Sequence, residues 1–210
     1  MNAEQLAAWY FRLNGFFTIT NFVLHPSRRG AQRTDADIAG IRFPYRSEFP
    51  DGVGGDDPEF NHHPGKTYFV IAEVKRGRCV LNGPWTDEMK QNMHAILGDL
   101  GPFRKEDIES VAHSLYQSGT YDDNNIYCSL FCVGDIPNPE IAQKYPNVPQ
   151  RSWEDVCHFL FDRFKEYQFR KADHDSWDQY GKNLWDSWLD KTREQFVANI
   201  RHQIGLNPTA

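Results

Sequence analysis

Hydrophobic residues in the first part of the chain recur with two different spacings. Between residues 3 and 13 they fall three and four positions apart, which predicts a helix with one apolar face. The pair Asn14-Gly15 follows directly and is typical of a helix end. Residues 16–24 are rich in aromatic and β-branched side chains, which is the composition of a strand. The chain is therefore expected to begin with a helix followed by a strand.

Two further apolar runs, residues 37–43 and 68–75, predict a second and a third strand, and both carry charge at one end. Asp37 begins the first run, and Glu73 and Lys75 lie at the end of the second. Successive side chains of a strand alternate between its two faces, so Glu73 and Lys75 point the same way. Opposite charges at the end of a core strand are costly to bury unless something there needs them. A divalent metal ion and a phosphate group would need both.

Between the third strand and residue 134 the pattern predicts two helices and another strand. The first helix covers residues 86–97, with Thr86 as its N-cap and acidic residues in its first turn. The second covers residues 105–117, where apolar residues at helical spacing line one face. Residues 125–133 have the composition of a strand, which would extend a mixed sheet. The 4 cysteines show no CxxC spacing, and we interpret them as small buried core residues.

Prolines separate this region from the remainder of the chain. They cluster within residues 135–150, which predicts an irregular connection rather than the interior of an element. After it, residues 151–206 show aromatic-rich stripes at helical spacing, beginning with Ser152 as an N-cap. We therefore expect a core over residues 1–134, the connection, and a helical C-terminal layer over residues 151–210 that packs on the core. We interpret the aromatic residues of this layer as core rather than as a platform for stacking bases.

A long polar segment, residues 44–67, separates the second predicted strand from the third. It is rich in glycine and proline, and it holds several acidic residues and the pair His62-His63. Loops of this length inside a compact domain are usually functional or mobile. A metal site built from these residues is one alternative, but two adjacent histidines are a weak metal signal. We favour a solvated acidic hairpin extension.

The order of these elements and charged residues resembles the PD-(D/E)XK phosphodiesterase superfamily, the restriction-endonuclease-like nucleases. The matching residues are Asp37, Glu73 and Lys75, and Glu4 fits a further acidic position on the first helix. The layout is most similar to the Holliday-resolvase-like and Mrr-like branches. The resemblance covers residues 3–80 well, and the helix and strand that follow more loosely. It implies an α/β fold with a restriction-endonuclease-like mixed β-sheet core flanked by helices, here with an added helical C-terminal layer.

Two details depart from the pattern of the superfamily. No proline precedes Asp37, although the superfamily is named for one. Asp35 competes with Asp37 for the motif position, and we favour Asp37 because it directly begins the apolar run. On the helix after the motif, Lys90 or Gln91 would be the auxiliary polar residue that the resemblance implies. A surface helix with ordinary polar residues is the interpretation that we favour there.

The resemblance also implies a metal-dependent reaction. Asp37, Glu73 and the intervening Val74 would bind Mg²⁺, for which Mn²⁺ can substitute. The metal lowers the pKa of a bound water and polarises the phosphate. Lys75 would orient the attacking water or neutralise the charge that develops. Glu4 would complete the site directly, through water or at a second metal. A structural ion pair of Glu73 with Lys75 is the alternative.

The net charge of −6 is unusual for a protein that binds phosphate groups. The charge is unevenly distributed, since residues 1–105 hold 13 basic and 12 acidic residues and residues 106–210 hold 10 and 17. The arginines that flank the proposed site in the sequence are Arg28, Arg29, Arg33, Arg76 and Arg78. We predict that they contact a nucleic-acid backbone, the alternative being ordinary solvated loops.

Two classes of function remain open. The first is a metal-dependent nuclease, with DNA as the expected substrate, that serves restriction, repair or mobile-element defence. The second is a non-catalytic or regulatory module of the same fold that binds a protein or nucleic-acid partner. A protein partner or a second copy of the chain would bind through its acidic C-terminal layer. No run reaches the roughly 18 apolar residues that a membrane helix needs. The N-terminus shows no signal-peptide pattern, so we expect a cytoplasmic protein without a membrane partner.

Overall fold

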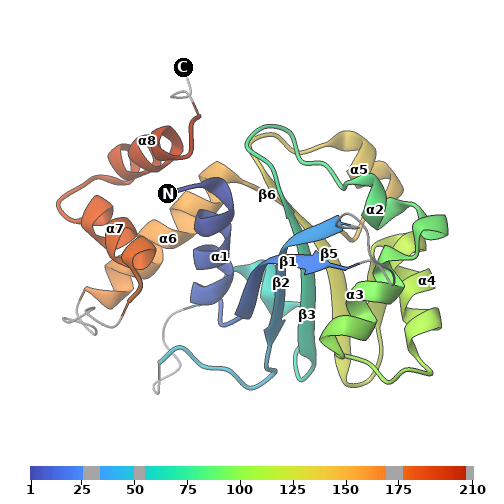
Figure 1. Cartoon of the computed structure of the whole chain (residues 1–210). Helices are drawn as coiled ribbons and strands as arrows, with labels where there is room; N and C mark the ends of the chain where they lie inside the picture. Colours follow the sequence, from blue (N-terminus) through green and yellow to red (C-terminus); the bar gives the residue numbers. More distant parts are fainter. Residues whose placement is uncertain (26–33, 50–54, 169–176, 207–210) are drawn as a thin grey trace.

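One mixed sheet lies between two layers of helices in the computed structural model, which describes residues 1–25, 34–49, 55–168 and 177–206 (Figure 1). The strands are β1 (Phe17–Leu24), β2 (Thr34–Arg42), β3 (Thr67–Val74), β4 (Thr120–Asp122), β5 (Ile126–Gly134) and β6 (Gln150–Ser152). Their order is β1-β2-β3-β5-β4, and β6 pairs with β5. The pairs β3–β5 and β5–β6 are parallel, and the others are antiparallel. The expected mixed α/β sheet flanked by helices is confirmed.

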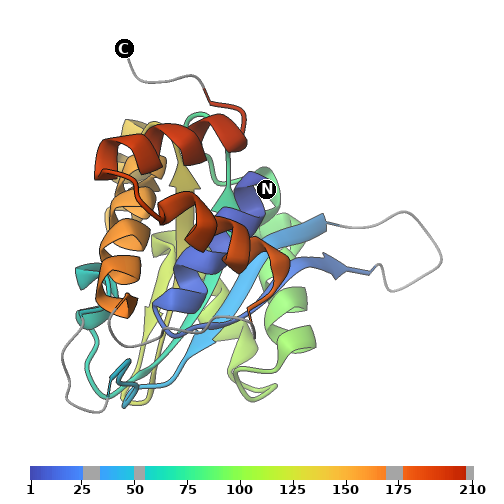
Figure 2. The same ribbon diagram turned by 90° about the vertical axis from the view of Figure 1, so that its left-hand side faces the viewer.

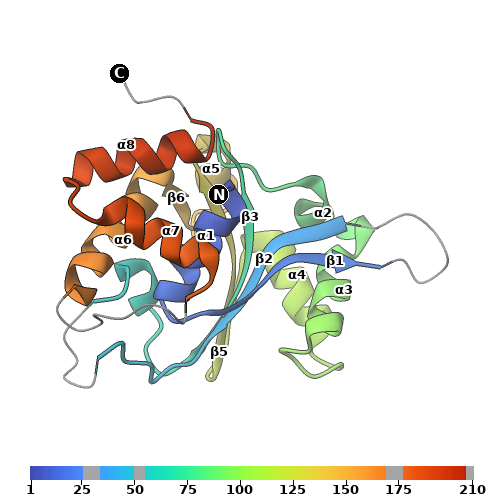
Figure 3. The same cartoon turned by 60° about the vertical axis from the view of Figure 1, so that its left-hand side comes forward.

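The helices divide between the two faces of this sheet (Figures 1 and 3). Their bounds are α1 (Ala3–Leu13), α2 (Gly83–Thr86), α3 (Asn92–Leu100), α4 (Ile108–Ser118), α5 (Pro139–Lys144), α6 (Trp153–Tyr167), α7 (Gln179–Trp188) and α8 (Arg193–Gln203). Helices α1, α6, α7 and α8 share one hydrophobic cluster with the sheet, and α3, α4 and α5 share another. Figure 2 looks onto the layer formed by α1, α6, α7 and α8, and shows α7 (orange-red) crossing in front of α1 (blue). No helix in the described part of the chain is long and apolar enough to cross a membrane.

Strand β3 is apolar almost throughout because both of its faces are covered by helices. Val70 and Val74 belong to the cluster shared with α1 and α6, whereas Phe69 and Ile71 belong to the cluster shared with α3 and α4. The alternation places Glu73 on the second face, beside the side chains that α2 and α3 contribute. The Glu73 carboxylate therefore lies at the end of a strand whose other side chains pack into the two hydrophobic clusters.

Helix α1 forms where the sequence predicts it. Asn2 and Gln5 make a capping box at its start, in which each side chain accepts a hydrogen bond from the other residue's backbone N–H. The chain turns after Asn14 because Gly15 adopts a φ of 84°, which favours glycine. Ser152 likewise caps α6, paired with Asp155. The helical C-terminal segment contributes Trp153, Leu160 and Phe196, among others, to the cluster that includes α1, so its aromatic residues are core, as expected.

The helix predicted over residues 86–97 is wrong as a single element. Asp87 caps a 3₁₀ turn over Glu88–Lys90, and α3 begins only at Asn92. Gln91 between them has a φ of 52°, a left-handed conformation that interrupts helical hydrogen bonding. Lys90 and Gln91 thus lie on this break rather than within a surface helix.

The proline-rich connection contains regular structure, contrary to the prediction. Asn138 caps α5, and Pro139 occupies its first turn, where the missing N–H costs no hydrogen bond. Strand β6 follows at Gln150–Ser152 and pairs with the end of β5. Smaller differences are that β2 begins at Thr34, before Asp37, and that α4 begins at Ile108. The 4 cysteines are free and buried, as expected.

The expected solvated acidic hairpin between β2 and β3 is also wrong in its described part. Residues 58–61 form a 3₁₀ turn, and Phe60 is buried in the core. Asp57 is buried and accepts hydrogen bonds from Tyr10 and Arg151. Asp56 is held by arginines. These carboxylates are buried because cations and hydroxyl groups from other elements satisfy them.

Candidate functional site

Three predicted site residues meet where β2 and β3 separate. The last paired residues of this antiparallel ladder are Ile38 and Ala72, which places Asp37 across from Glu73. The ammonium Nζ of Lys75 lies 2.8 Å from Glu73 Oε2 and 3.5 Å from Asp37 Oδ2. We call Asp37, Glu73 and Lys75 the strand-end cluster.

The Asp37 side chain continues the hydrogen bonding between β2 and β3 beyond the last backbone pair. Its Oδ2 accepts a hydrogen bond from the backbone N–H of Val74 at 2.7 Å. On the other side of β2, the β1 residue opposite Asp37 is Asn21, which has a φ of 52°. Strand pairing is therefore irregular at Asp37 on both sides of β2. The carbonyl of a strand residue points to the same strand edge as its N–H, so the Val74 carbonyl faces the edge that holds Asp37. Carboxylate and carbonyl oxygens therefore lie on one edge of β3.

Glu73 is 1 % exposed, and both of its carboxylate oxygens are hydrogen-bonded. Oε2 accepts from Lys75, and Oε1 accepts from the indole N–H of Trp85. Burial raises the pKa of Glu73 to about 7, against the opposing effect of the hydrogen bonds from Lys75 and Trp85. Burial alone would lower the pKa of Lys75, but the hydrogen bond and charge of Glu73 and the charge of Asp37 raise it. Lys75 is therefore a cation shared by two carboxylates.

The donor atoms of this site fit a hard divalent cation. Mg²⁺ typically uses one or two protein carboxylates and completes its shell with water and substrate oxygens. The side chains of Asp37 and Lys75 are 15 % and 29 % exposed, so this side of the cluster is open to solvent. Among the described residues, no group of three or more His, Cys, Asp or Glu side chains is placed to hold a metal ion. A metal here would therefore depend on Asp37, Glu73 and the Val74 carbonyl together with water or substrate oxygens.

The fourth predicted catalytic residue, Glu4, lies elsewhere in the described structure. It lines a pocket between α1, β1 and the start of α7, together with Thr18, Thr20 and Asp178. None of the three residues of the strand-end cluster lines that pocket. Asp35 lies two positions before Asp37 on β2 and pairs with Val23 of β1, away from the end of β3.

The other predicted residues flank the strand-end cluster or lie outside the described residues. Arg76 and Arg78 follow Lys75 directly and are exposed. Lys90 and Gln91 are exposed near α2, with Lys90 Nζ 3.8 Å from Asp87. The described contacts of these residues do not include the cluster. Arg28, Arg29 and Arg33 fall outside the described residues.

Two tryptophans that sequence reasoning did not assign to the site contact it from opposite faces of the sheet. Trp85 of α2 donates its indole N–H to Glu73. Trp153, at the start of α6, donates to the backbone carbonyls of Lys75 at 3.0 Å and Arg76 at 3.2 Å. A buried indole needs an acceptor for its N–H, and this general requirement is the only sign in the sequence that these tryptophans contact polar groups. Which acceptor each indole reaches depends on tertiary packing.

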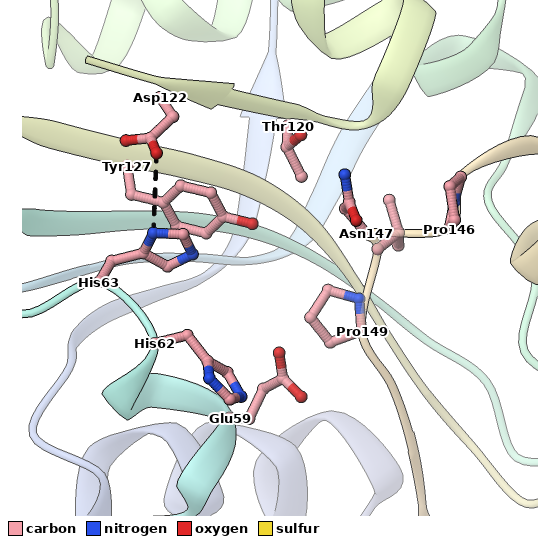
Figure 4. Close-up of a pocket in the computed structure, with 10 residues that line it drawn as sticks. Glu59, His62, His63, Thr120, Asp122, Tyr127, Pro146, Asn147 and Pro149 are labelled. Carbon is pink, nitrogen blue, oxygen red and sulfur yellow. Dashed lines mark ion pairs between the residues drawn. The ribbon is translucent and has the colours of Figure 1, made fainter.

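A second polar pocket lies at the other end of β3 and β5 (Figure 4). The His63 ring stacks on Tyr127 with centroids 3.5 Å apart, and its Nδ1 lies 3.8 Å from Asp122. Burial lowers the pKa of His63, although Asp122 opposes this. Glu59, which also lines the pocket, lies 3.5 Å from Arg151. The acidic groups here are already paired, which favours a structural role.

Searches of protein-family models, of curated proteins and of solved structures find no match to this chain. The function is therefore inferred from the chemistry of its own residues.

Proposed function

We propose that this protein is a metal-dependent nuclease that hydrolyses phosphodiester bonds, with DNA as the expected substrate. The observation that carries the proposal is the position of the Lys75 ammonium, 2.8 Å from Glu73 and 3.5 Å from Asp37 at the ends of adjacent strands. Oxygen ligands for a divalent cation and a positive group for a phosphoryl oxygen are thus within one small site.

The charge balance of the strand-end cluster supports cation binding. Two carboxylates share one ammonium, so the ionised cluster keeps one negative charge in excess. Burial raises the pKa of Glu73 against the opposing hydrogen bond and charge of Lys75, and the neighbouring charge of Asp37 raises it further. A divalent cation would favour the ionised form of both carboxylates. The site is therefore better satisfied with a cation than without one.

Each residue has a distinct part in the proposed reaction. Asp37, Glu73 and the Val74 carbonyl would hold Mg²⁺ or Mn²⁺, which supplies an activated water and polarises the phosphate. Lys75 would orient the attacking water or neutralise the negative charge that grows on the phosphoryl oxygens. Arg76 and Arg78 are exposed beside Lys75 and would contact the nucleic-acid backbone, which positions the strand without reading its sequence.

A metal-dependence panel tests the proposal directly. Wild-type protein is incubated with single- and double-stranded DNA and RNA in Mg²⁺, Mn²⁺ or Ca²⁺. We expect cleavage with Mg²⁺ or Mn²⁺ and binding without efficient cleavage with Ca²⁺. Glu73→Ala should abolish cleavage, whereas Asp122→Ala, which removes a carboxylate at the other end of the sheet, should retain it. The absence of cleavage with every metal and substrate, or equal cleavage by Glu73→Ala, contradicts the proposal.

One observation favours a second candidate, the non-catalytic module. Both oxygens of Glu73 are already hydrogen-bonded within the protein, so the cluster also satisfies the requirements of a structural ion pair. In that case the acidic C-terminal layer would bind a partner. Isothermal titration with Mn²⁺ separates the two candidates. The nuclease proposal predicts saturable Mn²⁺ binding that Glu73→Ala removes, whereas a structural ion pair predicts no such binding.

A further inference from the structure

The Glu73 carboxylate is held by one donor on each oxygen, and the two donors differ in kind. Lys75 is 29 % exposed on a flexible side chain, whereas Trp85 is completely buried. The Trp85 indole N–H donates to Oε1, which leaves Oε2 to Lys75. Of the two Glu73 oxygens, Oε2 is therefore the one that faces the Lys75 ammonium.

The rigidity of Trp85 comes from its position in the fold. It lies in the single turn of α2, where Pro84 fixes the backbone at the helix start. Its ring belongs to the hydrophobic cluster shared by α3 and α4. A packed indole has one N–H and no acceptor atom, so it offers a carboxylate the same hydrogen bond at all times. Lys75, in contrast, must be able to turn toward a phosphate if it takes part in the proposed reaction.

We propose that Trp85 is a positioning residue that fixes Glu73 Oε1 so that Oε2 is presented to a divalent cation beside Asp37. This inference rests on the proposed metal-dependent function. Trp85 touches neither the metal nor the substrate in this arrangement, and it acts through Glu73. Hydrogen-bond partners of metal-ligating carboxylates typically change metal affinity by 10–100-fold when they are removed.

The chain offers a matched control for the removal of this hydrogen bond. Trp9 is 3 % exposed, and its indole N–H donates to Asp178 at 3.2 Å. It lies on α1, on the opposite face of the sheet from Trp85. Trp85→Phe and Trp9→Phe therefore both withdraw an indole N–H from a carboxylate, the buried Glu73 in the site and the half-exposed Asp178 outside it.

The decisive experiment is isothermal titration of Mn²⁺ into wild-type protein, Trp85→Phe and Trp9→Phe, with cleavage kinetics run in parallel. We expect Trp85→Phe to weaken Mn²⁺ binding by about 10–100-fold. Its cleavage at low Mn²⁺ should fall and should recover at high Mn²⁺, because both carboxylates and Lys75 remain. Trp9→Phe should match wild type in both measurements. A role for Trp85 in packing alone would instead lower stability without changing the Mn²⁺ affinity of the folded protein.

A measurement on the unsubstituted Trp85 covers the case in which Trp85→Phe does not fold. In ¹⁵N-labelled wild-type protein, titration with Mg²⁺ in the absence of Mn²⁺ should change the chemical shift of the assigned Trp85 indole N–H. The chemical shift of the Trp9 indole N–H should stay the same. Glu73→Gln should also shift the Trp85 resonance, since a neutral acceptor replaces a carboxylate. A Trp85 resonance that does not respond to Mg²⁺ overturns the inference, whether or not it responds to Glu73→Gln.

The failure of the inference differs from the failure of the proposed function. If wild type binds Mn²⁺ and cleaves, and folded Trp85→Phe binds Mn²⁺ equally well, Trp85 has no positioning role but the nuclease proposal stands. If wild type neither binds divalent metal nor cleaves any nucleic acid, both are overturned.

Discussion

Two clusters of charged side chains in the described structure differ in how their carboxylates are paired. In the strand-end cluster, Asp37 and Glu73 share the single ammonium of Lys75. The other cluster surrounds Asp56, after the end of β2. There the Asp56 carboxylate pairs with three guanidinium groups, those of Arg42, Arg46 and Arg163, and Glu48 pairs with Arg46 and Arg163 as well. We call Asp56, Glu48 and these three arginines the loop cluster.

The loop cluster ties separate elements together. Arg42 Nη2 lies 2.6 Å from Asp56 Oδ2, and Arg163 Nη2 of α6 lies 2.9 Å from Oδ1. Arg42 also donates to the backbone carbonyls of Asn14 and Phe60. The planar guanidinium has five donors in a fixed fork, so each arginine can satisfy several acceptors at once. The segment after β2 is thus fastened to α1 and α6.

The two clusters shift the pKa of their carboxylates in opposite directions. Burial would raise the pKa of Asp56, but the hydrogen bonds and charges of Arg46 and Arg42 outweigh it and lower the pKa. At Glu73, burial outweighs Lys75 and raises the pKa to about 7. In the loop cluster each carboxylate is paired with at least one arginine, so the cluster is complete within the protein. The strand-end cluster has two carboxylates for one ammonium, and of these two clusters it is the one for which we propose a further cation.

The largest expected effect on stability comes from breaking the loop cluster. Asp56→Ala leaves the buried guanidinium of Arg163 without its closest carboxylate. Removal of one partner from a buried ion pair typically costs about 3–5 kcal/mol in the free energy of unfolding. Urea denaturation measures the change, and a loss below about 1 kcal/mol contradicts the structural role.

The largest expected effect on activity comes from Lys75. Lys75→Ala removes the positive group and leaves both carboxylates, so cleavage should fall by about 10²–10³-fold, or 3–4 kcal/mol in activation free energy. Mn²⁺ should still bind, because a repelling cation is gone. Glu73→Ala should lose both activity and Mn²⁺ affinity. Cleavage assays and isothermal titration distinguish the two variants, and wild-type cleavage by Lys75→Ala contradicts its assignment.

Stability should respond to pH through Glu73. Because its pKa in the folded protein is raised from 4.5 to about 7, the folded state holds this proton more tightly than the unfolded state. The contribution of Glu73 to stability is therefore favourable below pH 4.5 and falls as the pH rises to about 7. Without metal, Glu73→Gln should gain up to about 3 kcal/mol relative to wild type between pH 4.5 and pH 8. Urea denaturation in chelator measures this difference, and a constant difference contradicts the raised pKa.

The smallest expected effect comes from Trp153, which contacts the backbone rather than a charged group. Trp153→Phe removes the N–H that bonds to the carbonyls of Lys75 and Arg76. The loss should be about 1 kcal/mol in the free energy of unfolding, the net value of a typical hydrogen bond. Mn²⁺ affinity should stay at the wild-type value, in contrast to Trp85→Phe. A tenfold weaker affinity would show that the backbone of Lys75 also positions the metal site.

Predictions from local patterns were accurate where neighbours in sequence decide the structure. The helix over residues 3–13 and the Ser152 cap follow from spacing and capping chemistry within a few residues. The common direction of Glu73 and Lys75 follows from strand alternation, and Lys75 does contact Glu73. The helix over residues 86–97 failed because a single left-handed residue, Gln91, interrupts an otherwise helical pattern.

The sequence by itself determined the residues that carry charge at the strand ends and most of the elements, but not the break at Gln91 or the elements α5 and β6. Tertiary structure alone decided that Asp37 faces Glu73, because the register of two strands some thirty-five residues apart depends on long-range packing. It also decided which donors surround each buried carboxylate, such as Trp85 at Glu73 and Arg163 at Asp56. Periodicity reports which face of an element is buried, but it carries no information on which polar groups meet across that face.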